Sequence, residues 1–124
     1  ARTAAERLTP CVLELGGKDP FIICADANLK QACDILLRGV FQNAGQNCIG
    51  VERVFVEQGI EKDVLDRVVP VIEKMRQGGE NDDLAAMTMG EPAMERIQGL
   101  VDDAVKDGAK LVCGGKRNTD VSSG

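Results

Sequence analysis

The sequence predicts an α/β fold in which helices flank a mainly parallel sheet. Short apolar runs alternate along the chain with longer stretches whose apolar residues recur every three or four positions. This alternation is typical of strand–helix–strand units, whose connecting helices make consecutive strands parallel. The hydrophobic fraction is 44%, with three Phe and neither Trp nor Tyr, so aliphatic side chains must build the one core that 124 residues can enclose.

The first half of the chain has clear boundaries between its predicted elements. Pro10 should end the first helix, because proline interrupts a helix interior. Gly16 and Gly17 end the strand that follows, Asn28 offers a cap to the next helix, and residues 43–45 (Asn-Ala-Gly) stop that helix. The predicted elements are, in order, a helix at 1–8, strands at 11–15 and 20–24, a helix at 29–41 and a strand at 51–56.

The second half is predicted to add two helices and one strand. Pro70 should kink or interrupt the first of these helices, and Gly114 with Gly115 closes the final strand. The predicted elements are a helix at 61–75, a polar loop at 78–83, a helix at 92–106 and a strand at 110–113.

Composition excludes several classes of function. The net charge of −5 and the absence of a basic stripe argue against nucleic acid and anionic membrane surfaces as partners. With no His, a zinc site and a protease-type Cys–His pair are both disfavoured, and we expect no metal. An odd number of cysteines without a CxxC pair predicts a reducing intracellular compartment. The five cysteines are Cys11, Cys24, Cys33, Cys48 and Cys113.

Both ends of the chain look internal to something longer. Ala1 begins within a predicted helix, and residues 118–124 form a polar, Ser- and Gly-containing stretch. We therefore expect the chain to be a segment of a larger protein.

Two residues are candidates for chemistry. Glu14 follows Leu13 and precedes Leu15, and a carboxyl group enclosed by apolar neighbours would pick up and release a proton near neutrality. The alternative, which strand alternation by itself favours, is a Glu facing water on an edge strand. Cys48 lies between Gly45 and Gly50, where the backbone can approach a ligand and its N–H can hold an oxyanion.

The alternative for a free cysteine is a small buried hydrophobe. That interpretation is weak for Cys48, which lies in a polar loop, and is accepted for the other four cysteines because they fall in apolar runs.

Two motifs resemble the aldehyde dehydrogenase superfamily. Residues 13–20 (Leu-Glu-Leu-Gly-Gly-Lys-Asp-Pro) are similar to its glutamate signature, and residues 41–50 (Phe-Gln-Asn-Ala-Gly-Gln-Asn-Cys-Ile-Gly) to its cysteine signature. The candidate residues are 34 positions apart, which also agrees, and further similarity at 108–115 extends the resemblance over nearly the whole chain. Residues 87–92 depart from the family pattern, in which Gly and Pro are adjacent. Catalysis is not expected to depend directly on that loop.

The resemblance implies a fold, a domain boundary and a mechanism. Residues 1–16 would finish the nucleotide-binding domain, and residues 17–124 would begin the catalytic domain. Cys48 would attack an aldehyde to give a thiohemiacetal, hydride would pass to NAD or NADP, and Glu14 would activate the water that hydrolyses the thioester. The longer parent would form a homo-oligomer.

The resemblance also assigns neighbouring roles. Leu15 and Gly16 would approach the nicotinamide, Asn47 and Ile49 would line the aldehyde pocket, and an asparagine outside this chain would help to bind the oxyanion. Retention of Glu14 favours the acid-forming branch over acyl-CoA-forming relatives.

Two alternatives to catalysis by this segment's parent stay open. One is a non-catalytic scaffold that keeps the fold, since motifs alone do not prove activity. The other is a thiol redox sensor, which is disfavoured because Cys48 has no resolving cysteine near it in sequence.

Overall fold

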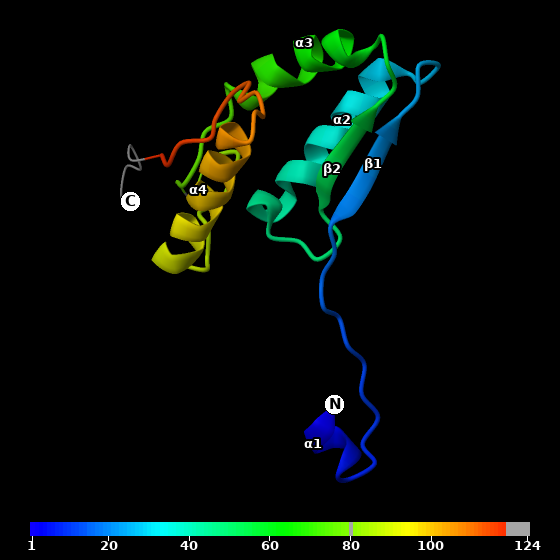
Figure 1. The fold of residues 1–124 in the computed structure, drawn as a ribbon, viewed down its shortest axis with the longest axis vertical. Coiled ribbons are helices and arrows are strands. Elements are labelled where there is room, and N and C mark those ends of the chain that lie inside the picture. The colour runs from blue at the N-terminus through cyan, green and yellow to red at the C-terminus, as the bar shows by residue number, and fades with distance from the viewer. Residues whose placement is uncertain (80, 119–124) are drawn as a thin grey trace.

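The computed structural model describes residues 1–79 and 81–118, so most of the stretch 118–124 lies outside the described residues. Its elements follow one another as shown in Figure 1. They are α1 (Arg2–Ala5), β1 (Asp19–Ile23), α2 (Leu29–Phe41), the 3₁₀ helix η1 (Gln42–Gly45), β2 (Val51–Val56), α3 (Glu61–Ile72) and α4 (Glu91–Lys106).

The two strands pair in parallel, as the sequence predicts. Asp19 lies opposite Val51 and Ile23 opposite Val56, with a register shift between Asp19 and Pro20. Parallel neighbours need a crossover connection, and α2 provides it. The predicted α/β architecture is therefore confirmed over β1, α2 and β2.

Helix α2 packs closely against β2 and α3. Its N-terminus is capped by Asn28, whose side-chain oxygen accepts a hydrogen bond from Gln31 N at 3.2 Å. A Cβ added at Gly39 would lie 2.8 Å from Val51 Cγ2. Glycine in the last turn of this helix therefore allows the helix backbone to approach the strand.

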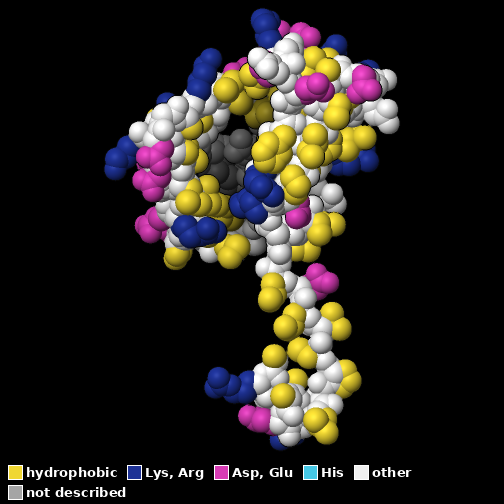
Figure 2. All heavy atoms as spheres, turned by 45° about the vertical axis from the view of Figure 1, so that its right-hand side comes forward, with side chains coloured by type: hydrophobic (Ala, Val, Ile, Leu, Met, Phe, Trp, Pro, Cys, Tyr) yellow, Lys and Arg dark blue, Asp and Glu magenta, His cyan; other side chains and the backbone are white. Residues whose placement is uncertain are grey.

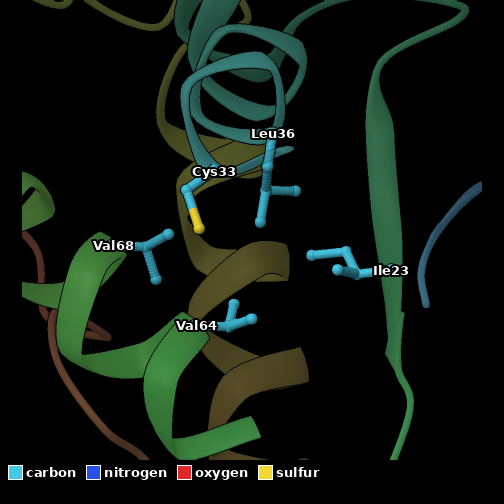
Figure 3. Close-up of a cluster of buried hydrophobic side chains, with 5 residues drawn as sticks. All are labelled: Ile23, Cys33, Leu36, Val64 and Val68. Carbon is cyan, nitrogen blue, oxygen red and sulfur yellow. The ribbon is translucent and has the colours of Figure 1, made fainter. Parts of the chain in front are cut away.

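Five buried side chains form the core where β1, α2 and α3 meet, and Figure 3 shows them pointing toward one another. They are Ile23, Cys33, Leu36, Val64 and Val68. Burial raises the pKa of the Cys33 thiol, because desolvation disfavours the thiolate. Cys33 is thus the buried hydrophobe that the sequence predicts.

Replacing Leu36 with alanine should destabilise this core strongly. Leu36 is 5% exposed, and truncating a buried leucine costs about 2–5 kcal/mol of unfolding free energy. Its neighbour Ile35 is 51% exposed, so Ile35→Ala is the matched control and should cost far less. Urea unfolding followed by circular dichroism measures both. Equal losses in the two variants would contradict this description of the core.

Two predicted strands are wrong. Residues 11–15 and 110–113 form neither helix nor strand. Both segments have apolar, strand-like composition, but a strand exists only when another strand pairs with its backbone. Among residues 1–79 and 81–118, the only paired strands are β1 and β2.

Two predicted helices end early. α1 stops at Ala5 rather than residue 8, and Leu8 adopts a positive φ of 54°. α3 accommodates Pro70 and ends at Ile72 rather than residue 75. The next amides, of Lys74 and Met75, bond three residues back, which tightens the chain into a turn instead of prolonging the helix.

Residues 9–18, here called the arm, extend away from the body formed by β1, β2, α2 and α3, with α1 at the far end (Figure 1). Apolar side chains line the arm without being covered (Figure 2), including Val12 at 88% and Leu15 at 86% exposure. Within the described part of the chain, no helix is long and apolar enough to cross a membrane.

Candidate active site

Cys48 lies in a tight turn at residues 47–50, between η1 and β2. Gly50 N donates to Asn47 O at 3.2 Å, which closes the turn with Cys48 and Ile49 at its centre. The Asn47 side-chain oxygen accepts from Ile49 N at 3.3 Å and lies 3.9 Å from Cys48 Sγ. The thiol is exposed, and no described residue accepts a hydrogen bond from the Cys48 amide. One residue therefore presents both an exposed thiol and an N–H group that no described residue accepts.

A left-handed turn connects α2 to this loop. Asn43, Ala44 and Gly45 have φ values of 53°, 55° and 74°. This conformation costs a residue with a Cβ roughly 1–2 kcal/mol, although Asn adopts it more readily. The predicted stop at 43–45 is confirmed, and the turn points the following residues toward the start of β2.

Local hydrogen bonds hold that turn. Asn43 Nδ2 donates to Gln46 O at 2.9 Å, while Gln46 N and Nε2 donate to Asn43 O at 3.1 and 3.2 Å. These reciprocal bonds offset part of the backbone strain.

One further contact ties the loop to a distant segment. Gln46 Oε1 accepts from both Thr88 N and Thr88 Oγ1, each at 2.9 Å. Thr88 lies in the loop before α4, and no feature of the sequence connects this loop with Cys48. The two residues are 42 positions apart, and neither periodicity nor motif spacing signals such a contact.

Glu14, Leu15 and Gly16 all lie in the exposed arm. The predicted enclosure of Glu14 by apolar neighbours is wrong for this chain, because Glu14 is exposed and Leu15 is 86% exposed. Gly16 adopts a φ of 84°, and a Cβ built on it would meet nothing within 4 Å. The structure thus gathers Asn47, Cys48 and Ile49 in one turn but does not bring Glu14 against Cys48.

Both candidate residues nevertheless belong to the same end of the sheet. Cys48 precedes the first residue of β2, and Glu14 precedes the first residue of β1, and these strands run parallel from paired starts. Five residues of extended chain span about 17 Å at most, which limits how far Glu14 can lie from the start of β1.

The root of the arm is fixed to β2. Arg53 Nε donates to Lys18 O at 2.8 Å, and Lys18 forms an ion pair with Glu52. Rearrangement of the arm would therefore have to occur between this anchor and Glu14.

Three of the other cysteines differ from their predicted burial. Cys11 and Cys24 are exposed and Cys113 is partly exposed, so the prediction that all three are buried is wrong. Cys11 and Cys113 belong to the unpaired segments that were expected to be strands. Within residues 1–79 and 81–118, no group of three or more His, Cys, Asp or Glu could hold a metal ion.

Comparison with known proteins decides the family. The model of the aldehyde dehydrogenase family matches residues 1–124. The chain belongs to the aldehyde dehydrogenase family. An aldehyde dehydrogenase-like protein of Schizosaccharomyces pombe is 44% identical over 120 residues, which cover 94% of this chain and 23% of the relative. A protein of Mycobacterium tuberculosis named as a succinate-semialdehyde dehydrogenase [NADP(+)] is 36% identical over 124 residues, covering 98% and 24%.

Solved structures show the same fold. The NAD+ complex of an aldehyde dehydrogenase from Bacillus cereus superposes with a TM-score of 0.84 at 32% identity, covering 94% of this chain and 24% of that one. The predicted aldehyde dehydrogenase fold is thereby confirmed. This aldehyde dehydrogenase chain spans about a quarter of the length of the relatives it matches.

Proposed function

We propose that this chain supplies the nucleophile Cys48 and the base Glu14 to an NAD(P)-dependent enzyme that oxidises an aldehyde to a carboxylic acid. The observation that carries the proposal is that one turn holds both the exposed thiol of Cys48 and its amide, which donates to no residue that the structure describes. The rest of the catalytic site belongs to the longer parent protein.

The turn suits attack on a carbonyl group. As the Cys48 thiolate forms a bond to the carbonyl carbon, negative charge develops on the carbonyl oxygen. The Cys48 N–H can donate a hydrogen bond to that oxygen and stabilise the charge. Because Asn47 already accepts from Ile49 N, the turn is organised before the substrate arrives.

The arm fits a nicotinamide cofactor. Leu15 is exposed and the space around Gly16 is open, so a planar ring can approach this stretch of backbone. NAD or NADP, when bound, accepts the hydride that leaves the substrate carbon. Relatives include one named for NADP(+) and a structure with NAD+, so either cofactor suits the proposal.

Glu14 completes the cycle by hydrolysis. Its carboxylate takes a proton from water, the hydroxide oxygen bonds to the thioester carbon, and the bond from that carbon to Cys48 Sγ breaks. The carboxylic acid leaves, and the proton that Glu14 took from water passes to the sulfur, which regenerates the thiol and the Glu14 carboxylate. This step requires the arm to bring Glu14 toward the turn at residues 47–50.

Several further assignments belong to the same proposal. Ile49, 76% exposed, offers apolar surface to the aldehyde, while Asn47 shapes the pocket through its bond to Ile49 N. Residues 1–16 finish the nucleotide-binding domain and residues 17–124 begin the catalytic domain, a boundary supported by the exposed arm. The parent is a homo-oligomer in a reducing intracellular compartment.

The full-length parent should reduce NAD or NADP when supplied with aldehydes, whereas the isolated 124-residue chain should not. Most of the parent, and with it most of the cofactor site, lies outside this segment. Absorbance of the reduced cofactor measures both rates over a panel of aliphatic and aromatic aldehydes. Turnover by the isolated chain would contradict the proposal, and a parent without turnover on any aldehyde would favour a non-catalytic scaffold.

A further inference from the structure

The side chain of Gln46 joins two segments that are far apart in sequence. Its Oε1 accepts from the amide and the hydroxyl of Thr88, both at 2.9 Å. Its Nε2 donates to Asn43 O at 3.2 Å. A single amide group therefore bonds to the left-handed turn after α2 and to the loop before α4.

The location of these bonds matters for Cys48. The turn at residues 47–50 is closed by its own hydrogen bonds, which fix its shape but not its position on the body. Its C-terminal end is fixed by Gly50, which is buried where β2 begins. At its N-terminal end, the bonds to Thr88 are the contacts of Gln46 that reach beyond the loop in the described part of the chain.

We propose that Gln46 is a positioning residue, which fixes the Cys48 thiol by anchoring the N-terminal side of its loop to Thr88. The proposal rests on the proposed function for its catalytic consequence. The hydrogen bonds of the Gln46 side chain go to Asn43 and Thr88, and that of the Cys48 thiol goes to Asn47. Gln46 acts by keeping the nucleophile and the Cys48 amide in one place relative to the bound aldehyde, and small displacements of a reacting group carry large kinetic costs.

Neither partner titrates near neutrality, since the contact joins an amide to a hydroxyl and a backbone N–H. Loss of the contact should therefore lower kcat by the same factor at every pH between about 6 and 9. A residue that moved protons would instead change the shape of the pH profile.

The test uses four single variants of the full-length parent and one double variant. Gln46→Met removes the acceptor and the donor while keeping the length of the side chain. Gln46→Glu keeps an acceptor for both groups of Thr88 but loses the donor to Asn43. Thr88→Val removes the hydroxyl and leaves the amide. The matched control is Gln42→Met, since Gln42 is exposed and its side chain makes no hydrogen bond to any described residue.

Gln46→Met should lower kcat by about 10- to 100-fold with little change in the KM for the cofactor. Gln46→Glu should recover most of the rate, and Thr88→Val should show a smaller loss. Gln46→Met and Thr88→Val combined should lose no more than Gln46→Met alone, because both remove one contact. Unchanged kcat in Gln46→Met, or a Gln46→Glu variant as slow as Gln46→Met, would overturn the proposal.

Amide hydrogen exchange separates this inference from the proposed function. In the unliganded parent, Gln46→Met should speed exchange at Thr88 and at Ile49, whereas Gln42→Met should not. Unchanged exchange at Ile49 would overturn the role of Gln46, whatever the enzyme's activity. Faster exchange in a parent without dehydrogenase activity would support Gln46 as the anchor of the loop. The missing activity would then contradict the proposed function and not the role of Gln46.

Discussion

Replacing Cys48 with serine in the full-length parent is expected to lower aldehyde oxidation by about 10³-fold or more, or at least about 4 kcal/mol in activation free energy. A serine hydroxyl loses its proton far less readily than a thiol, so the nucleophilic anion is almost absent near neutrality. The turn should survive, because Asn47, Ile49 and Gly50 make the hydrogen bonds that close it. The sulfur takes part in neither bond. Steady-state formation of reduced cofactor measures the loss.

Cys24 provides the matched control for this substitution. It is also exposed, but it follows β1 and lies outside the loop between η1 and β2. Cys24→Ser should keep full activity. Competitive alkylation followed by peptide mass mapping, with and without NAD, should find cofactor-dependent labelling at Cys48. Full activity of Cys48→Ser, or preferential labelling of another cysteine, would end the assignment.

The parts of the fold that the sequence predicted correctly depend on local signals. α2 has the predicted bounds because Asn28 caps one end and the left-handed turn at 43–45 stops the other. β1 and β2 were identified from apolar, β-branched composition, and the helix between them dictates that they run parallel. Neighbouring residues decide each of these features, so a single sequence contains enough information.

The errors come from features that depend on distant partners. Residues 11–15 and 110–113 have the composition of strands, but no described strand pairs with them. The relatives of this chain are about four times as long, and we expect enclosure of Glu14 to need segments that they contain outside the matched region. The contact of Gln46 with Thr88 spans 42 positions. The roles of Cys48 as nucleophile and Glu14 as base stay predictions. They rest on the two sequence motifs, and kinetic measurements of the variants test them.

Replacing Glu14 with glutamine should slow hydrolysis of the acyl-enzyme by about 10²- to 10⁴-fold, the usual contribution of a general base. Glutamine has nearly the same size but cannot accept the proton of the attacking water. Acylation of Cys48 does not need that proton transfer and should remain fast. Rapid mixing should therefore show a burst of reduced cofactor, at most one equivalent per subunit, followed by slow turnover.

The burst distinguishes a base from a residue that only shapes the arm. If Glu14 merely held the arm in place, its loss would impair cofactor binding and slow the burst together with the steady state. Glu6→Gln is the matched control, because Glu6 is an exposed glutamate just after α1 and should leave both phases intact. A Glu14→Gln enzyme with normal steady-state turnover would show that another group activates the water. A lost burst would show that the arm's position, and not its carboxylate, is what the reaction requires.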